Sequence, residues 1–126
     1  MKLIITDSIY EKEFKPLELI FPIDLMKLAA KKSMCGLGEN IKNSSKIPST
    51  ILKKVYLTSS GGAGRAIFLL QIGGENSFLV ILRLKNDKKV GENMTISNPK
   101  FKKVLEKNLD LIFEEIKQGR YREFEI

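Results

Sequence analysis

Two uninterrupted apolar runs constrain the fold of this chain more than any other feature. The runs are Ile67–Leu70 and Phe78–Leu82, and the connection between them contains Gly73–Gly74–Glu75–Asn76. Short apolar runs separated by a glycine-rich turn are typical of the two strands of a β-hairpin. Because both runs are continuous rather than alternating, we expect both faces of these strands to be covered, by helices on at least one side.

Further strands are predicted on either side of this hairpin. Thr50–Thr58 is rich in β-formers and precedes the expected strands Arg65–Ile72 and Ser77–Lys85, which together indicate an antiparallel meander. Lys2–Thr6 is short and β-rich, and we expect it at an edge of the sheet. The tail Arg120–Ile126 alternates charged and aromatic residues, which suits either a strand or a mobile end.

Helices are predicted before and after the meander. Asp7 is expected to cap a brief helix that Pro16 ends, and Ile23–Lys32 keeps apolar residues at helical spacing. Asn98–Pro99 opens the last helix, with Asn as N-cap and Pro at the first helical position, and Gly119 ends it.

This order of elements predicts an α+β fold. We expect an antiparallel sheet of about four strands, with two N-terminal helices and one C-terminal helix beside it. The polar stretch Glu39–Ser49 is interpreted as a loop. The chain has 126 residues and contains no repeat or linker, so residues 1–126 are expected to form a single domain. Its apolar runs are too short to cross a bilayer.

The charge of the chain favours a polyanionic partner. Lys and Arg number 22 against 15 Asp and Glu, for a net charge of +7. Residues 76–103 hold seven basic and two acidic residues, whereas residues 104–126 hold four basic and six acidic ones. A localised basic segment indicates a nucleic-acid site, although a basic protein without such a ligand remains open.

The absence of histidine excludes several kinds of chemistry. With no His and one Cys, the chain has no His-based metal site, no Ser-His-Asp triad and no internal disulfide, which fits a reducing cytoplasm. No Asp/Glu cluster has the spacing of metal ligands, so neither metal nor cofactor is expected. The acidic pairs Glu11 and Glu13, and Glu114 and Glu115, are interpreted as solvated helix faces.

Cationic side chains lie on or near all three strands of the predicted meander. They are Lys53, Lys54, Arg65, Arg83 and Lys85, with Tyr56 on the same face as Lys54. If they converge, they can orient a phosphate and stabilise the charge that develops during its transfer, with a lysine or the tyrosine as general acid or base. The alternative is a set of solvated cations spread along strand ends.

The last helix has its charges reversed relative to the helix dipole. Three lysines open the helix, whereas the dipole favours acids there. They are Lys100, Lys102 and Lys103. A sequence that tolerates this arrangement either uses these lysines for a ligand or bears the small cost of roughly 0.3–1 kcal/mol for each.

Two segments together resemble a known family. The stretch Gly61–Leu70 (GGAGRAIFLL), followed by Phe78–Thr95 (FLVILRLKNDKKVGENMT), resembles the RelE/HigB-type toxins of type II toxin–antitoxin systems, within the RelE/ParE superfamily. Lys53–Lys54 before the glycine-rich turn also fits. The resemblance covers about residues 50–117.

The resemblance implies a RelE-like fold and a toxin that is a metal-independent endoribonuclease. Such toxins cleave mRNA, usually in the ribosomal A site, with the RNA 2′-OH as nucleophile, leave a cyclic phosphate and so inhibit translation. It further implies cytoplasmic location and a cognate antitoxin that covers the basic surface. Two alternatives stay open: a ParE-like toxin that binds a protein such as DNA gyrase, and a non-catalytic nucleic-acid-binding module.

The resemblance also assigns roles to residues. Arg65 is expected to contact the scissile phosphate, with Arg83 and Lys85 as a second group of catalytic cations. Lys54 or Lys85 is expected to assist proton transfer. The residues expected to bind RNA are Lys53, Tyr56, Lys88, Lys89, Lys100, Lys102, Lys103 and Tyr121. Of these, Tyr56 and Tyr121 are the candidates for stacking on bases.

Overall fold

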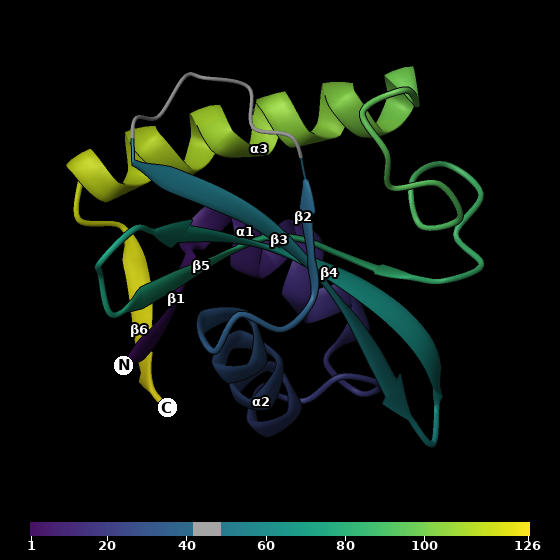
Figure 1. Ribbon diagram of the computed structural model, residues 1–126, viewed down its shortest axis with the longest axis horizontal. Helices are drawn as coiled ribbons and strands as arrows, with labels where there is room; N and C mark the ends of the chain where they lie inside the picture. Colours follow the sequence, from purple (N-terminus) through teal and green to yellow (C-terminus); the bar gives the residue numbers. More distant parts are fainter. Residues whose placement is uncertain (42–48) are drawn as a thin grey trace.

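A computed structural model describes residues 1–41 and 49–126 and shows an α+β fold (Figure 1). The described residues form an open sheet of six strands in the order β2-β3-β4-β5-β1-β6. The strands are β1 (Lys2–Thr6), β2 (Glu39–Ile41), β3 (Thr50–Ser59), β4 (Gly62–Gln71), β5 (Asn76–Leu84) and β6 (Tyr121–Glu125). The helices are α1 (Asp7–Ile9), α2 (Ile23–Met34) and α3 (Pro99–Lys117), with a π-helical turn η1 (Tyr10–Phe14) and a 3-10 turn η2 (Lys15–Leu17).

The predicted meander is confirmed, but the predicted strand count is wrong. β3, β4 and β5 pair antiparallel in sequence order, as expected from their turns. The sheet has six strands rather than about four, because Glu39–Ile41 and Tyr121–Glu125 each add a strand at an edge. The stretch read as a loop therefore begins with a strand, and its residues 42–48 lie outside the described residues.

The expected position of the first strand is also wrong. β1 lies inside the sheet, parallel to β5 through the pair Ile4 and Phe78, and antiparallel to β6 through Ile4 and Glu123. The reason is the C-terminal tail, which forms β6 and covers the edge that β1 would otherwise present. The sheet is thus mixed rather than antiparallel.

Helices cover both faces of the sheet, which explains the continuous apolar runs. Figure 1 shows α2 on one side of β3, β4 and β5 and α3 on the other. Side chains of both strands are fully buried, among them Ile67, Phe68, Leu79 and Ile81. They belong to one hydrophobic cluster that includes residues of α2 and α3. None of the helices in the described ranges is long and apolar enough to span a membrane.

The predicted N-cap of α3 and its predicted end at Gly119 are confirmed, whereas the prediction that Asp7 caps the first helix is wrong. The Asn98 side chain accepts a hydrogen bond from the N–H of Lys100 at 3.1 Å, and Gly119 ends the helix with a φ of 70°. At α1 the N-cap is Thr6, whose side chain makes no cap bond. The carboxylate of Glu115 accepts from the N–H of Ser8 instead, at 3.0 Å, so this glutamate is buried and not solvated as expected.

Candidate functional site

A row of three directly paired residues crosses the centre of the sheet. Tyr56 of β3 is opposite Arg65 of β4, and Arg65 is opposite Arg83 of β5. Residues directly opposite in antiparallel strands project from the same face. Gly64, the neighbour of Arg65 in β4, faces the other way: a Cβ there would meet the ring of Phe21, just before α2. The side chains of the row therefore project from the face away from α2.

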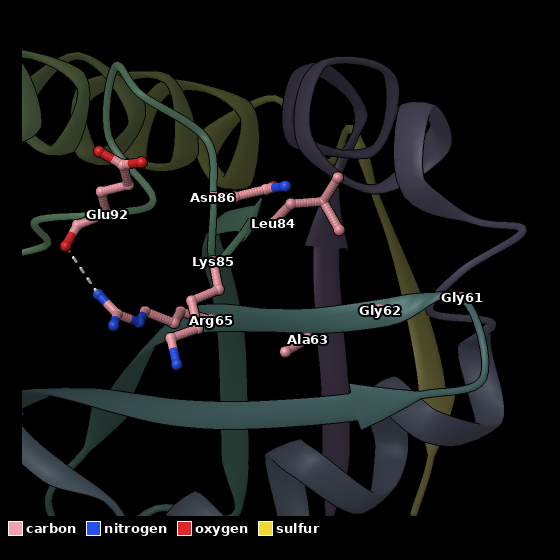
Figure 2. Close-up of a pocket in the computed structure, with 8 residues that line it drawn as sticks. All are labelled: Gly61, Gly62, Ala63, Arg65, Leu84, Lys85, Asn86 and Glu92. Atoms are coloured by element: carbon pink, nitrogen blue, oxygen red, sulfur yellow. Dashed lines mark hydrogen bonds between the residues drawn. The ribbon is translucent and has the colours of Figure 1, made fainter.

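Lys85 extends from the same face just beyond β5. Its backbone N–H donates to the carbonyl of Ala63 at 2.9 Å, which continues the strand pairing by one residue. Figure 2 shows its side chain running across β4 close to Arg65. A pocket of about 480 Å³ opens here between the turn at Gly61 and the stretch from Leu84 to Glu92. Two cations of adjacent strands therefore lie in one concave region.

The guanidinium of Arg65 is fixed on two sides. Its Nη1 donates to the carbonyl oxygens of Gly91 at 2.9 Å and Glu92 at 3.2 Å, and its Cζ lies 5.3 Å from the centre of the Tyr56 ring. Its Nε is buried and has no acceptor among the described residues. The group is thus held in place while part of its donor capacity stays unused.

Lys54 and Tyr56 converge on a carboxylate that the sequence did not single out. The Nζ of Lys54 lies 3.2 Å from Oε2 of Glu39, and the Tyr56 hydroxyl donates to Oε1 at 3.3 Å. The hydrogen bond from Lys54, together with its charge, holds the pKa of Glu39 below its ordinary value. The Lys54 side chain is 9% exposed, so this lysine is largely committed to Glu39. Glu39 sits in the stretch interpreted as a loop, and no sequence signal marks it.

Arg83 is bound by a buried carboxylate. Its Nε and Nη2 each donate to Glu13 at 3.0 Å, and Glu13 also accepts the backbone N–H of Leu82 at 3.0 Å. The hydrogen bond to Glu13 raises the pKa of Arg83, so the guanidinium stays charged. The Glu13 side chain is 0% exposed, so its interpretation as part of a solvated helix face is wrong. The Glu13 carboxylate thus accepts a backbone hydrogen bond from a part of β5 that lies beyond the residues paired with β1.

A turn built on Asp87 connects Arg83 to Arg65. The Oδ2 of Asp87 accepts the N–H groups of Val90 at 2.9 Å and Gly91 at 3.0 Å, and lies 3.8 Å from Nη1 of Arg83. Burial acts to raise the pKa of Asp87, but the two N–H bonds and the charge of Arg83 hold it below its ordinary value. A Cβ on Gly91 would collide with the Leu84 carbonyl. The turn therefore sets where the carbonyls that hold Arg65 lie.

The other candidate residues are distributed around this region. Lys53 projects from the opposite face and lines a separate pocket with Ser33 and Met34 of α2. Tyr121 opens β6, so β5 and β1 stand between it and β4. The remaining candidates are exposed, in the connection after β5 or in the first turns of α3: Lys88, Lys89, Lys100, Lys102 and Lys103. Lys54, Tyr56, Arg65, Arg83 and Lys85 are the candidates that share one face.

Residues 1–41 and 49–126 contain no group of three or more His, Cys, Asp or Glu side chains arranged to hold a metal ion. The site consists instead of cations, one phenol ring and the carboxylates that pair with them. Comparison of the chain with protein-family models, with curated proteins and with solved structures finds no match.

Proposed function

We propose that this chain is a RelE/HigB-type toxin with a RelE-like fold, a metal-independent endoribonuclease that cleaves mRNA. The observation that carries the proposal is the cross-strand row of Tyr56, Arg65 and Arg83, with Lys54 and Lys85 on the same face and a pocket beside them. Cations fixed on a rigid sheet suit a phosphodiester, whose charge increases in the transition state.

Arg65 is the residue we assign to the scissile phosphate. Its guanidinium is already oriented by the Gly91 and Glu92 carbonyls and by the Tyr56 ring, so binding requires little reorganisation. Arginine presents several donors in a planar fork that matches two phosphate oxygens at once. The Tyr56 ring, 49% exposed as a residue, offers a surface on which a base can stack.

Of the two lysines expected to assist proton transfer, Lys85 is the better placed. It is exposed and makes no ion pair within the described ranges, whereas Lys54 is paired with Glu39. Arg83 acts in this proposal through charge and by holding the turn, because Glu13 already occupies two of its donors.

The reaction that fits these groups is transfer of the phosphoryl centre to the neighbouring ribose. The 2′-oxygen forms a bond to phosphorus, the bond to the 5′-oxygen of the next nucleotide breaks, and a cyclic phosphate remains. The 2′-hydroxyl gives its proton to a water molecule, and the departing 5′-oxygen gains a proton from the protein. Arg65 stabilises the added negative charge on the phosphate, and Lys85 donates to the departing oxygen.

The biological setting that we propose follows from the resemblance to RelE/HigB-type toxins. We propose that mRNA on the ribosome is the substrate, so that cleavage inhibits translation in the cytoplasm. A cognate antitoxin would neutralise the protein by covering the basic face. The contacts to RNA would fall steeply with salt, since they are largely contacts to phosphates.

Induced expression followed by primer extension on cellular mRNA tests the proposal. We expect growth arrest and discrete new 5′ ends with the natural chain, and neither with Arg65→Ala. Lys85→Ala is expected to reduce cleavage strongly. Lys53→Ala is the matched control, because it removes one positive charge from the opposite face and should leave cleavage intact.

A second test separates cleavage from other forms of toxicity. With mRNA bound to purified ribosomes as substrate, the purified protein should cut the message and should fail where a 2′-deoxyribose replaces the ribose at the cleaved position. Growth arrest without new 5′ ends, accompanied by inhibition of gyrase, would contradict the nuclease and support a ParE-like toxin. One observation favours the ParE-like alternative: Glu13 already balances the charge of Arg83, which leaves that arginine less able to bind a phosphate.

A further inference from the structure

Glu13 is a buried carboxylate in the π-helical turn η1, and its ion pair with Arg83 is the only contact it makes with a charged group among the described residues. An ion pair buried in this way often contributes no more stability than apolar residues of the same size. Turns of π-helix are rare and occur frequently at functional sites. These observations indicate a role for Glu13 beyond filling space in the core.

The carboxylate of Glu13 orients the guanidinium of Arg83. Its two oxygens accept from Nε and Nη2 of Arg83, each at 3.0 Å. These bonds occupy one edge of the planar group and leave the third nitrogen, Nη1, on the other side. Nη1 lies 3.8 Å from Oδ2 of Asp87. A bidentate pair fixes direction as well as distance, so Glu13 determines where Arg83 presents its remaining donor to Asp87.

Asp87 connects this pair to the carbonyls that hold Arg65. Its Oδ2 accepts the N–H groups of Val90 at 2.9 Å and Gly91 at 3.0 Å, and its backbone carbonyl accepts the N–H of Glu92 at 2.9 Å. The carbonyls of Gly91 and Glu92 in turn accept from Nη1 of Arg65, and Figure 2 shows the bond to Glu92. We call this series of contacts, from Glu13 through Arg83 and Asp87 to Arg65, the Glu13–Arg65 relay.

The relay leaves the charge of Arg65 available. Arg65 and Arg83 are directly opposite in β4 and β5, and Glu13 compensates only the charge of Arg83. Within residues 1–41 and 49–126, Arg65 forms no ion pair and is held by neutral carbonyls instead. The acids of the relay therefore orient Arg65 without neutralising it, which is what a phosphate-binding cation requires.

We propose that Glu13 is a positioning residue for Arg65 and acts on it through Arg83 and Asp87. The proposal rests on the function proposed above, which assigns Arg65 to the scissile phosphate. Glu13 also accepts the N–H of Leu82 at 3.0 Å, a structural role that a neutral amide oxygen can fill as well. Glu13→Gln therefore separates the two roles, because it keeps an acceptor for this N–H and removes the charge that binds Arg83.

Single-turnover cleavage of mRNA bound to purified ribosomes tests the relay. Glu13→Gln should lower the saturating rate by roughly 10–100-fold, since a misplacement of about 1 Å costs on the order of 100-fold, and should leave the half-saturating protein concentration unchanged. The matched control is Glu115→Gln, which removes the charge of another buried carboxylate that accepts a backbone N–H, that of Ser8. This variant should cleave at the natural rate.

A measurement that does not depend on cleavage follows Arg65 itself. In protein with isotopically labelled arginine, the NMR resonance of the Arg65 Nε–H group is identified by its loss in Arg65→Lys. We expect Glu13→Gln to shift this resonance and Glu115→Gln to leave it in place. Asp87→Ala is the second test variant if Glu13→Gln does not fold, because it breaks the relay at its middle contact and should cause the same shift and the same loss of rate.

The possible outcomes distinguish this inference from the proposed function. A natural rate in the folded test variant would overturn the relay, as would an equal loss of rate in Glu13→Gln and Glu115→Gln. A change in the half-saturating concentration at an unchanged rate would also overturn it, since Glu13 would then act on binding. If the natural chain cleaves mRNA and the Arg65 resonance does not move, the relay alone is refuted. If the resonance moves but the natural chain does not cleave mRNA, the relay stands and the proposed function falls.

Discussion

Arg65 and Tyr56 face each other directly across β3 and β4, with the guanidinium carbon 5.3 Å from the centre of the phenol ring. Lys54 approaches the same ring, with its Nζ 5.7 Å from the centre. A cation over an aromatic ring is stabilised by the negative face of the ring. Tyr56 thus has two partners within the protein, and its exposed side chain lies opposite Arg65, which lines the pocket.

The first prediction separates the ring of Tyr56 from its hydroxyl. Tyr56→Ala should weaken RNA binding by about 1–3 kcal/mol, the usual value of one base stacked on an aromatic side chain. Tyr56→Phe keeps the ring and loses the bond to Glu39, so it should bind RNA nearly as well as the natural chain. Anisotropy with a labelled RNA measures both variants. Equal losses in the two variants would show that the hydroxyl, rather than stacking, is what binding requires.

The second prediction concerns the pair of Arg83 and Glu13. Arg83→Ala leaves a buried carboxylate without its charged partner, so we expect the free energy of unfolding to fall by about 1.5–3 kcal/mol. Urea unfolding measures this change. Lys85→Ala, two residues later and exposed, should stay within about 0.5 kcal/mol of the natural chain.

A double variant checks that the two residues act as a pair. Glu13→Gln retains the size of the side chain and removes its charge, so Arg83→Ala should cost less in that background than in the natural chain. Additive losses would contradict the pairing and would return Arg83 to the role of an independent RNA-binding cation.

The third prediction tests the turn that holds Arg65. Gly91→Ala places a methyl group against the Leu84 carbonyl, and we expect it to destabilise the protein by about 1–3 kcal/mol and to abolish RNA cleavage. Thermal unfolding and cleavage assays report the two effects. Gly61→Ala is the control for stability alone, because the new methyl would meet side-chain atoms of Ile20, the nearest at 3.2 Å, rather than a backbone carbonyl. Full cleavage by Gly91→Ala would show that the position of the 91–92 carbonyls is not needed.

The fourth prediction is a dependence of stability on pH through Asp87. Because the pKa of Asp87 is lower in the folded protein than its ordinary value of 3.8, its contribution to stability is complete above 3.8 and is lost as the pH falls through the folded value. The groups that face its carboxylate are Arg83, Lys89 and the N–H groups of Val90 and Gly91. We therefore expect the natural chain to lose stability on acidification more steeply than Asp87→Asn.

Urea unfolding from neutral pH to about pH 3 measures this difference, which should approach about 1.4 kcal/mol per pH unit for one proton. The variant should be less stable than the natural chain at neutral pH and approach it in acid. Parallel curves for the two proteins would exclude Asp87 as the titrating group.

Local signals in the sequence predicted the elements that depend on local physics. The caps of α3 at Asn98 and Gly119 and the strands of the meander are confirmed, because side chain and turn chemistry within a few residues decide them. The sequence alone left the register of the strands open, so it allowed Tyr56, Arg65 and Arg83 to share a face but did not establish it. It became certain from the strand pairing, which sequence alone does not fix.

What the sequence did not reveal depends on contacts between distant segments. Glu13 lies 70 residues before Arg83 and Ser8 lies 107 before Glu115, so neither carboxylate shows its partner in any local pattern. Both look like ordinary acidic positions on a helix. Glu39 was missed for the same reason, since its interaction with Lys54 requires β2 to pair with β3.

The placement of β1 has a consequence for the chain while it is being synthesised. This strand precedes both of its partners in the chain, which are residues 76–78 of β5 and residues 121–125 of β6. Its backbone groups stay unpaired on one edge until β5 has been synthesised, and on the other until β6 has been synthesised. The chain therefore cannot complete its central sheet before β6 has been synthesised, so the order of the strands along the chain delays the closure of the sheet.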